Sequence, residues 1–113
     1  RPVLISISLG GYESEHDVIF QCATEPGTVP ENDTWIKRKR NTVARFGVSS
    51  WLLRCKMITI TGKGPTEVEE AFTRRFALKS SNGGGAPDEY ALHGGGFPVR
   101  VQGVDGVVGV VSV

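Results

Sequence analysis

A histidine followed by a run of glycines is the most specific chemical feature of this sequence. Gly94, Gly95 and Gly96 follow His93 and precede Phe97, which is itself followed by proline. Successive glycines allow backbone conformations that other residues avoid, and their N–H groups can form a concavity that binds an anion. The histidine could ligate a metal or a haem iron, or donate a proton. The structural alternative is a tight hairpin in which this histidine is hydrogen-bonded within the turn.

A second candidate is a lysine on the apolar face of a predicted helix that spans residues 34–46. Ile36, Lys39 and Val43 recur at helical spacing, so the lysine shares a face with apolar residues that pack inward. A lysine in that position extends its ammonium past the apolar surface, pairs with an acid, or faces a ligand anion. The first of these is the commonest arrangement.

The same region of the chain is basic. Arg38, Asn41 and Arg45 form an adjoining stripe of the helix and could supply forked donors to a carboxylate or phosphate. No acidic residue lies between Trp35 and Lys56, where the basic residues are Lys37, Arg38, Lys39, Arg40, Arg45, Arg54 and Lys56. Such a stripe could bind nucleic acid. Because the net charge is only +1 and no nucleic-acid-binding signature accompanies the run, we expect a solvated helix face and no nucleic acid as partner.

The common catalytic templates are incomplete in this sequence. It has no P-loop, no Gly-x-Ser-x-Gly elbow and no His-Glu-x-x-His, and His16 and His93 are its only histidines. Ser49 and Ser50 lack a local partner that would activate a hydroxyl. The sequence therefore specifies no enzymatic reaction.

Length and composition indicate one globular domain over residues 1–113. Of the 113 residues, 39% are hydrophobic and 22% are charged, and no apolar run approaches the ~20 residues of a membrane-spanning helix. We therefore expect no contact with a membrane. Cys22 and Cys55 form neither a disulfide framework nor a Cys-x-x-Cys pair. With no signal peptide visible after Arg1, these free thiols predict a cytoplasmic location.

The pattern of elements predicts an α+β fold with a mainly antiparallel sheet. Strands are expected over residues 3–9, 18–23, 90–93, 97–102 and 107–113, and helices over 34–46, 49–60 and 66–79. Asn32 or Asp33 should cap the first helix. The segment 49–60 could also be a helix that runs into a strand. Residues 80–85 are expected to form a linker, and Asp105-Gly106 predicts a hairpin with a type I′ turn.

Three segments resemble the GlcG/HbpS superfamily, whose usual label is the haem-degrading domain. They are WIKRKRNTVARFGVSS at residues 35–50, YALHGGGFPVRV at 90–101 and GVVGV at 106–110. The resemblance covers most of the chain. It is closest to an uncharacterised branch of bacteria and fungi that includes a yeast protein linked to the targeting of tail-anchored proteins.

The resemblance implies a profilin-like domain with a five-stranded antiparallel sheet, packed helices and assembly into homo-oligomers. It also implies that an N-terminal helix and a C-terminal segment of the family are missing from this chain. The positions that match the family motifs are Lys39, Phe46, Ser50, His93, Gly94, Gly95, Gly96, Phe97 and Pro98.

Two functions from different classes follow from these features, and a third is conditional. The first is binding of haem, a related tetrapyrrole or a small anion. His93 would be an axial ligand of the haem iron, and the basic helix, which carries the candidate ligand-binding residues Arg38 and Lys39, would face the propionates. It requires an apolar slot beside His93, for which Phe97, Phe46 and Trp51 are candidates. The alternative is a non-enzymatic oligomeric scaffold or adaptor for protein partners. An enzyme acting on a small anionic metabolite would need Lys39 and His93 to converge on one pocket.

Overall fold

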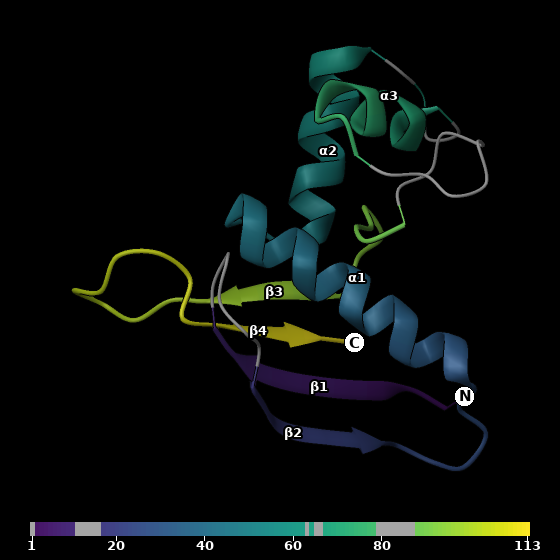
Figure 1. The fold of residues 1–113 in the computed structure, drawn as a ribbon, viewed down its shortest axis with the longest axis vertical. Coiled ribbons are helices and arrows are strands. Elements are labelled where there is room, and N and C mark those ends of the chain that lie inside the picture. Colours follow the sequence, from purple (N-terminus) through teal and green to yellow (C-terminus); the bar gives the residue numbers. More distant parts are fainter. Residues whose placement is uncertain (1, 11–16, 63, 65–66, 79–87) are drawn as a thin grey trace.

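The computed structural model describes residues 2–10, 17–62, 64, 67–78 and 88–113. Helix α1 (Pro30–Phe46) lies across one face of a sheet, and α2 (Ser50–Thr61) and α3 (Val68–Arg75) form a second helical unit beside it (Figure 1). The described residues form four strands, which are β1 (Leu4–Leu9), β2 (Asp17–Ala23), β3 (Gly96–Val99) and β4 (Gly109–Ser112). The predicted α+β class with an antiparallel sheet is confirmed.

The sheet has the strand order β2-β1-β4-β3, and every neighbouring pair is antiparallel. Side chains alternate between its two faces. Val110 is buried against Val43 and Ala44 of α1, so its neighbours Ser8 and Pro98 lie on the same face, beneath the helix. The opposite face is the outer face of the sheet. It carries a row of paired residues, in the order Phe20, Ile7, Val111 and Phe97.

Helix α1 begins four residues earlier than the sequence pattern predicts. Pro30 occupies its first turn, and the residue before it is Val29, whose N–H donates to the Asn32 side chain at 2.7 Å. Neither Asn32 nor Asp33 is the cap, because the fixed φ of Pro30 already suits the first helical position. Gly47 ends the helix at φ 72°, as expected.

The ambiguous segment 49–60 is a helix, because both of its ends are capped. Ser49 accepts a hydrogen bond from the Leu52 amide, and Gly62 adopts φ 68° after the last turn. Leu53 and Met57 of α2 pack with Val68 and Phe72 of α3 and with Leu92. This cluster is the larger of the two cores described by the structure.

The segment Tyr90–His93 was expected to be a strand and is not one. Its main chain is bound by side chains of α1 instead: the Ala91 amide donates to Thr42 Oγ1 at 2.8 Å, and Arg38 donates to the Tyr90 carbonyl. The single N–H of Ala91 is thus used by a side chain and is lost to a ladder. The described residues form four strands, so the five-strand count is not confirmed within them. The profilin-like arrangement stays a prediction.

The β3–β4 hairpin is confirmed, but its turn is not the predicted one. The Val104 amide donates to the Val101 carbonyl at 3.0 Å and Gly103 has φ 83°, as in a type II turn. At Asp105-Gly106 only the glycine has positive φ, whereas type I′ needs both.

Two further predictions fall partly or wholly outside the described residues. The helix expected over 66–79 is observed as Val68–Arg75, and both expected ends, Thr66 and Lys79, lie outside that part of the chain. The linker predicted at 80–85 lies outside it as well. In the part that is described, no helix combines the length and the apolar character needed to cross a membrane.

Candidate functional site

A cleft of about 390 Å³ opens between the start of β1, the first turns of α1 and the end of β4. Its polar side chains come from α1, and its other side chains are apolar. The lining residues are Pro2, Val3, Leu4, Asn32, Trp35, Lys39 and Val113. Three of them, Asn32, Trp35 and Lys39, follow the i, i+3, i+7 spacing of one helix face. We call this space the Lys39 cleft.

Lys39 is the cation of the cleft, and it is half-buried. Its Nζ donates to the main-chain oxygen of Val113 at 2.8 Å. Burial lowers the pKa of this ammonium from its ordinary value. Among the described residues, no carboxylate side chain forms an ion pair with Lys39. The cleft therefore holds a partly desolvated positive charge that has room for an anion beside it.

Trp35 forms the wall between the cleft and the predicted histidine site. The guanidinium carbon of Arg38 lies 4.4 Å from the centroid of the Trp35 ring, in a cation–π contact. The ring of His93 meets Trp35 edge-on, with centroids 4.7 Å apart. Lys39 and His93 are thus close to the same indole, but His93 does not line the cleft. The condition for the enzyme hypothesis, convergence on one pocket, is not met there.

His93 faces a carboxylate rather than a cavity. Its Nδ1 lies 3.4 Å from Oε1 of Glu69 in α3, and 47% of its side chain is exposed. Burial is the main cause that lowers the pKa of His93. Arg54, Arg38 and Lys39 lower this pKa further, and Glu69 opposes them. Sequence reasoning did not find Glu69, because it lies in a helix 24 residues earlier in the chain and nothing in the local pattern connects the two.

The glycine run is required for close packing. A Cβ on Gly95 would lie 2.7 Å from the Val113 oxygen, and this glycine has φ 113°. A Cβ on Gly96 would lie 2.9 Å from Val43 of α1. The Gly96 amide donates to the buried hydroxyl of Ser50 at 3.1 Å. Gly95, Gly96 and Ser50, three of the predicted site residues, therefore hold the start of β3 against α1 and α2. The Gly96 amide, which was expected to help bind an anion, is already used by Ser50.

The forked donors predicted on α1 bind this chain itself. Nε and Nη2 of Arg38 donate to the Tyr90 carbonyl at 3.1 and 3.0 Å. Asn41 donates to the Glu89 carbonyl, and Arg45 donates to the Tyr90 hydroxyl at 3.2 Å. These hydrogen bonds fix the segment 89–91 against the helix, so this stripe serves the fold.

The apolar slot expected beside His93 is not assembled from the predicted residues. Phe46 packs in the core against Phe72 and Phe76. Phe97 is 55% exposed on the outer face of the sheet, and Trp51 is 59% exposed on α2, beside Gly94. The described residues thus do not fit a haem held edge-on against His93. The part of the chain with described positions also holds no group of three or more His, Cys, Asp or Glu suited to a metal ion.

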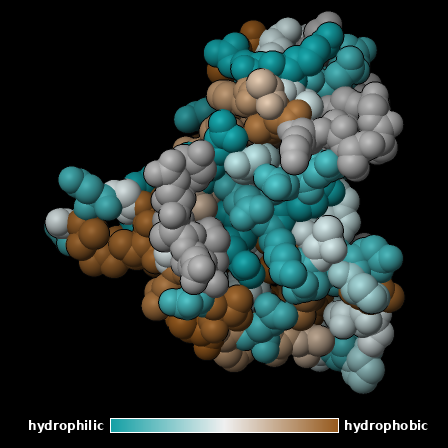
Figure 2. All heavy atoms as spheres, in the orientation of Figure 1, coloured by the Kyte–Doolittle hydropathy of each residue, from teal (hydrophilic) through white to brown (hydrophobic). Residues whose placement is uncertain are grey.

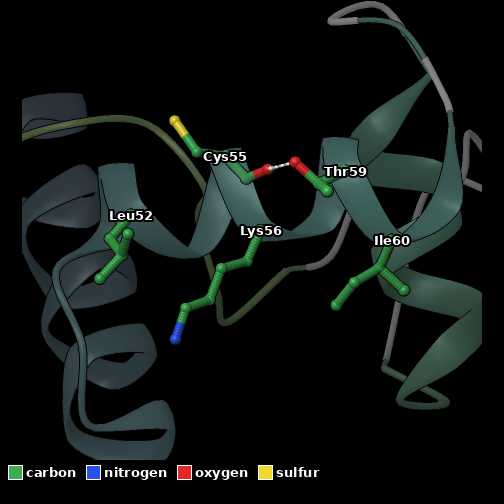
Figure 3. Close-up of a pocket in the computed structure, with 5 residues that line it drawn as sticks. All are labelled: Leu52, Cys55, Lys56, Thr59 and Ile60. Carbon is green, nitrogen blue, oxygen red and sulfur yellow. Dashed lines mark hydrogen bonds between the residues drawn. The ribbon is translucent and has the colours of Figure 1, made fainter.

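A second hollow, which sequence reasoning missed, runs along the exposed side of α2. It has a volume of about 320 Å³ and is lined by Leu52, Cys55, Lys56, Thr59 and Ile60. Figure 3 shows Leu52, Lys56 and Ile60 on one side of the helix, at i, i+4 and i+8. That spacing was the available signal. We call this hollow the α2 groove.

Comparisons with known proteins give one family for the whole chain. A family model described as haem degrading protein HbpS-like matches residues 1–113. A UPF0303 protein of Streptomyces avermitilis is 41% identical over 112 residues, which are 99% of this chain and 55% of that protein. The UPF0303 protein YBR137W of Saccharomyces cerevisiae is 34% identical over 90% of this chain and 45% of its own. The crystal structure of the Ybr137w protein superposes with a TM-score of 0.73 at 30% identity, covering 99% of this chain and 53% of that one. The chain thus spans about half the length of the relatives it matches.

Proposed function

The chain belongs to the HbpS-like family of haem degrading proteins, and we propose that its domain binds a small anionic ligand in the Lys39 cleft. The ligand class is a carboxylate on a flat, apolar body. The carboxylate would pair with Lys39, and the body would lie along Trp35 and the apolar start of β1. Propionate groups of a tetrapyrrole belong to the same chemistry. We propose that the domain acts as a homo-oligomer, and that it does so in the cytoplasm.

One observation carries this proposal: the Lys39 ammonium is partly desolvated and, among the residues that the structure describes, has the main-chain oxygen of Val113 but no acidic side chain beside it. A cation in such a place gains more from an anion than a fully hydrated lysine does, because the cost of removing water has been paid during folding. The mixed lining, with the amide of Asn32 near apolar walls, is typical of small-molecule sites.

The test is a titration of the purified chain with benzoate, followed by Trp fluorescence in a Trp51→Phe background. Lys39→Met should weaken binding at least about tenfold, which corresponds to one charge-assisted hydrogen bond. Lys37→Met is the matched control, because Lys37 is 62% exposed and pairs with Asp33 on the same helix. Equal affinities for the Lys39→Met and Lys37→Met proteins would refute the proposal.

Haemin is a separate probe, because the family description raises it and the described residues offer no slot at His93. Haemin is titrated against the chain, against Lys39→Met and against His93→Ala while the Soret band is recorded. Loss of a saturable shift in His93→Ala would support axial ligation. Loss only in Lys39→Met would place a propionate in the cleft instead.

The α2 groove favours a second candidate function, an oligomeric scaffold or adaptor for protein partners. Its apolar side chains include Leu52, 44% exposed, and Ile60, 58% exposed. Contiguous exposed apolar residues mark interaction sites in many proteins. If this candidate is correct, benzoate and haemin both fail to bind, while Ile60→Glu abolishes association with a protein partner.

A further inference from the structure

Strand β2 exposes apolar side chains on both of its faces. Val18, Ile19 and Phe20 are 47, 60 and 50% exposed. β2 is also an edge strand, because it pairs only with β1 in the described sheet (Figure 1). Figure 2 shows hydrophilic side chains over the middle of the molecule and hydrophobic ones gathered below them, over the strands. An exposed apolar edge strand readily pairs with another chain unless it is covered.

The two edges of the sheet differ in their ability to pair with another strand. At the other edge, β3 carries Pro98, which lacks an N–H. The Val113 amide donates to the Gly95 carbonyl at 2.8 Å. Because bonded and non-bonded pairs alternate along an antiparallel ladder, Gly95 and Phe97 direct their main-chain groups toward β4, and Pro98 directs its backbone nitrogen away from the sheet. β2 contains neither proline nor lysine, the residues that commonly protect an edge.

The outward main-chain groups of β2 can be identified from one hydrogen bond. The Thr24 amide donates to the Val3 carbonyl at 2.9 Å. Because bonded and non-bonded pairs alternate along an antiparallel ladder, Cys22 and Phe20 point their main chain toward β1. Gln21 and Ala23 therefore direct their N–H and C=O groups away from the sheet. Among the described residues these groups have no main-chain partner.

We propose that two copies of this chain pair through the edge of β2, antiparallel and about a two-fold axis at Cys22. Gln21 of each copy exchanges both main-chain hydrogen bonds with Ala23 of the other, so four new bonds form. The sheets join into one of twice the width. This inference names the interface of the homo-oligomer in the proposed function.

The register follows from the shape of β2. The pairing of β1 with β2 shifts between Ile7 and Ser8, which leaves Ile19 as the extra residue of a bulge. Beyond this bulge the ladder with β1 runs without a break from Phe20 to Ala23 and continues through the Thr24 amide, which donates to Val3. Cys22 is the midpoint of these five residues. In this register Phe20 of one copy lies diagonal to Cys22 of the other on the outer face, where each covers apolar surface of its neighbour.

A second copy suits this edge because the paired stretch carries no charge. Residues 20–24 read Phe-Gln-Cys-Ala-Thr, so a two-fold axis brings no like charges together. A foreign partner chosen by electrostatics would need charged positions in this stretch. β-Strand addition needs only the free main-chain groups, and the same edge on the second copy supplies them in the complementary direction.

The experiment measures the mass of the intact chain by sedimentation equilibrium, with no ligand present. The wild-type chain and Gln21→Ala, which keeps the N–H, should be dimers. Gln21→Pro removes an N–H that β1 does not use, and by symmetry it removes two hydrogen bonds from the dimer. It should raise the dissociation constant at least about tenfold. Circular dichroism verifies that the variant is folded.

Cross-linking gives a second measurement that does not depend on the proline variant. Residues opposite each other in a non-bonded antiparallel pair have Cα atoms about 4.5 Å apart, within the range of a disulfide. Mild oxidation with diamide should therefore link two copies through Cys22. Cys22→Ser should abolish the link, and Cys55→Ser should retain it.

Three outcomes would overturn the inference: a monomeric wild-type chain, a dimer unaffected by Gln21→Pro, or a link through Cys55 alone. A confirmed dimer that binds no benzoate would leave this interface standing and refute only the ligand proposal.

Discussion

The two sides of helix α1 carry similar residues and use them differently. On one side, Arg38, Thr42 and Arg45 bind the segment 89–91 of the same chain. On the other side, Lys39 lies in a cleft and, within the described part of the chain, binds one main-chain oxygen. Arg38 and Lys39 are adjacent in sequence, yet the first serves the fold, whereas the second binds the ligand in the proposed function. The course of the main chain around the helix decides this, since segment 89–91 runs past one side only.

Gly95 lies where the cleft side of the helix meets the sheet, and its substitution has the largest expected effect. In Gly95→Ala the new Cβ would lie 2.7 Å from the Val113 oxygen and 3.2 Å from Lys39 Nζ, at φ 113°. Strain and overpacking together should lower the free energy of unfolding by about 3 kcal/mol. Urea denaturation measures this loss. Gly94→Ala is the control, because its Cβ would make an ordinary contact of 3.5 Å with Trp51. Equal losses in both variants would contradict the packing role.

Thr42→Val removes a contact between the opposite side of the helix and segment 89–91. Thr42 is fully buried, accepts a hydrogen bond from the Ala91 amide and donates to the Arg38 carbonyl at 3.0 Å. Valine would leave a buried N–H without an acceptor, so we expect the free energy of unfolding to fall by about 2 kcal/mol. Thr59→Val is the matched control, because Thr59 makes the same helix-internal bond on an exposed surface. Its loss should be below about 0.5 kcal/mol. A small loss in Thr42→Val would mean that segment 89–91 is fixed by other contacts.

A pair of substitutions compares the two adjacent cations directly. Arg38→Met removes two hydrogen bonds to Tyr90 and the contact with Trp35, and it should lower the free energy of unfolding by about 2 kcal/mol. Lys39→Met removes one hydrogen bond but also a partly desolvated charge, so its change should stay within about 1 kcal/mol. Thermal or urea unfolding of both proteins at neutral pH makes the comparison. A larger loss in Lys39→Met would show that this lysine also serves the fold.

The elements were more predictable from the sequence than the contacts between them. Periodicity and capping residues indicated β1, β2, α1 and the β3–β4 hairpin, because these signals are local. Tyr90–His93 was wrongly predicted as a strand, because its hydrogen-bond partners lie on a helix about 50 residues earlier. Local secondary-structure propensity carries no information about hydrogen-bond partners that are distant in the sequence.

The candidate site was predictable in part for the same reason. Lys39 was found because its face of the helix is visible in the spacing, and Asn32 and Trp35 share that spacing. The slot predicted from Phe46, Phe97 and Trp51 failed, because the three rings lie in the core, on the outer sheet face and on α2. Which residues meet across elements depends on packing that the sequence does not display.

The smallest expected effect concerns His93, whose ring contacts Trp35 edge-on. Its pKa responds to charges on both sides of α1. Burial and the cations Arg54, Arg38 and Lys39 lower its pKa below the ordinary 6.5, against the opposing charge of Glu69. Because the folded pKa lies below the unfolded one, the unfolded chain binds more protons between the two values. The contribution of His93 to stability is therefore fully present above pH 6.5 and is lost as the pH falls through the folded pKa.

An NMR titration of the His93 ring should give a pKa below 6.5. The free energy of unfolding of His93→Gln should fall less steeply than that of the wild type between pH 7 and 5. Lys39→Met should raise the His93 pKa by removing one of the three cations. An unchanged pKa in that variant would mean that the indole separates the two groups electrostatically as well as sterically.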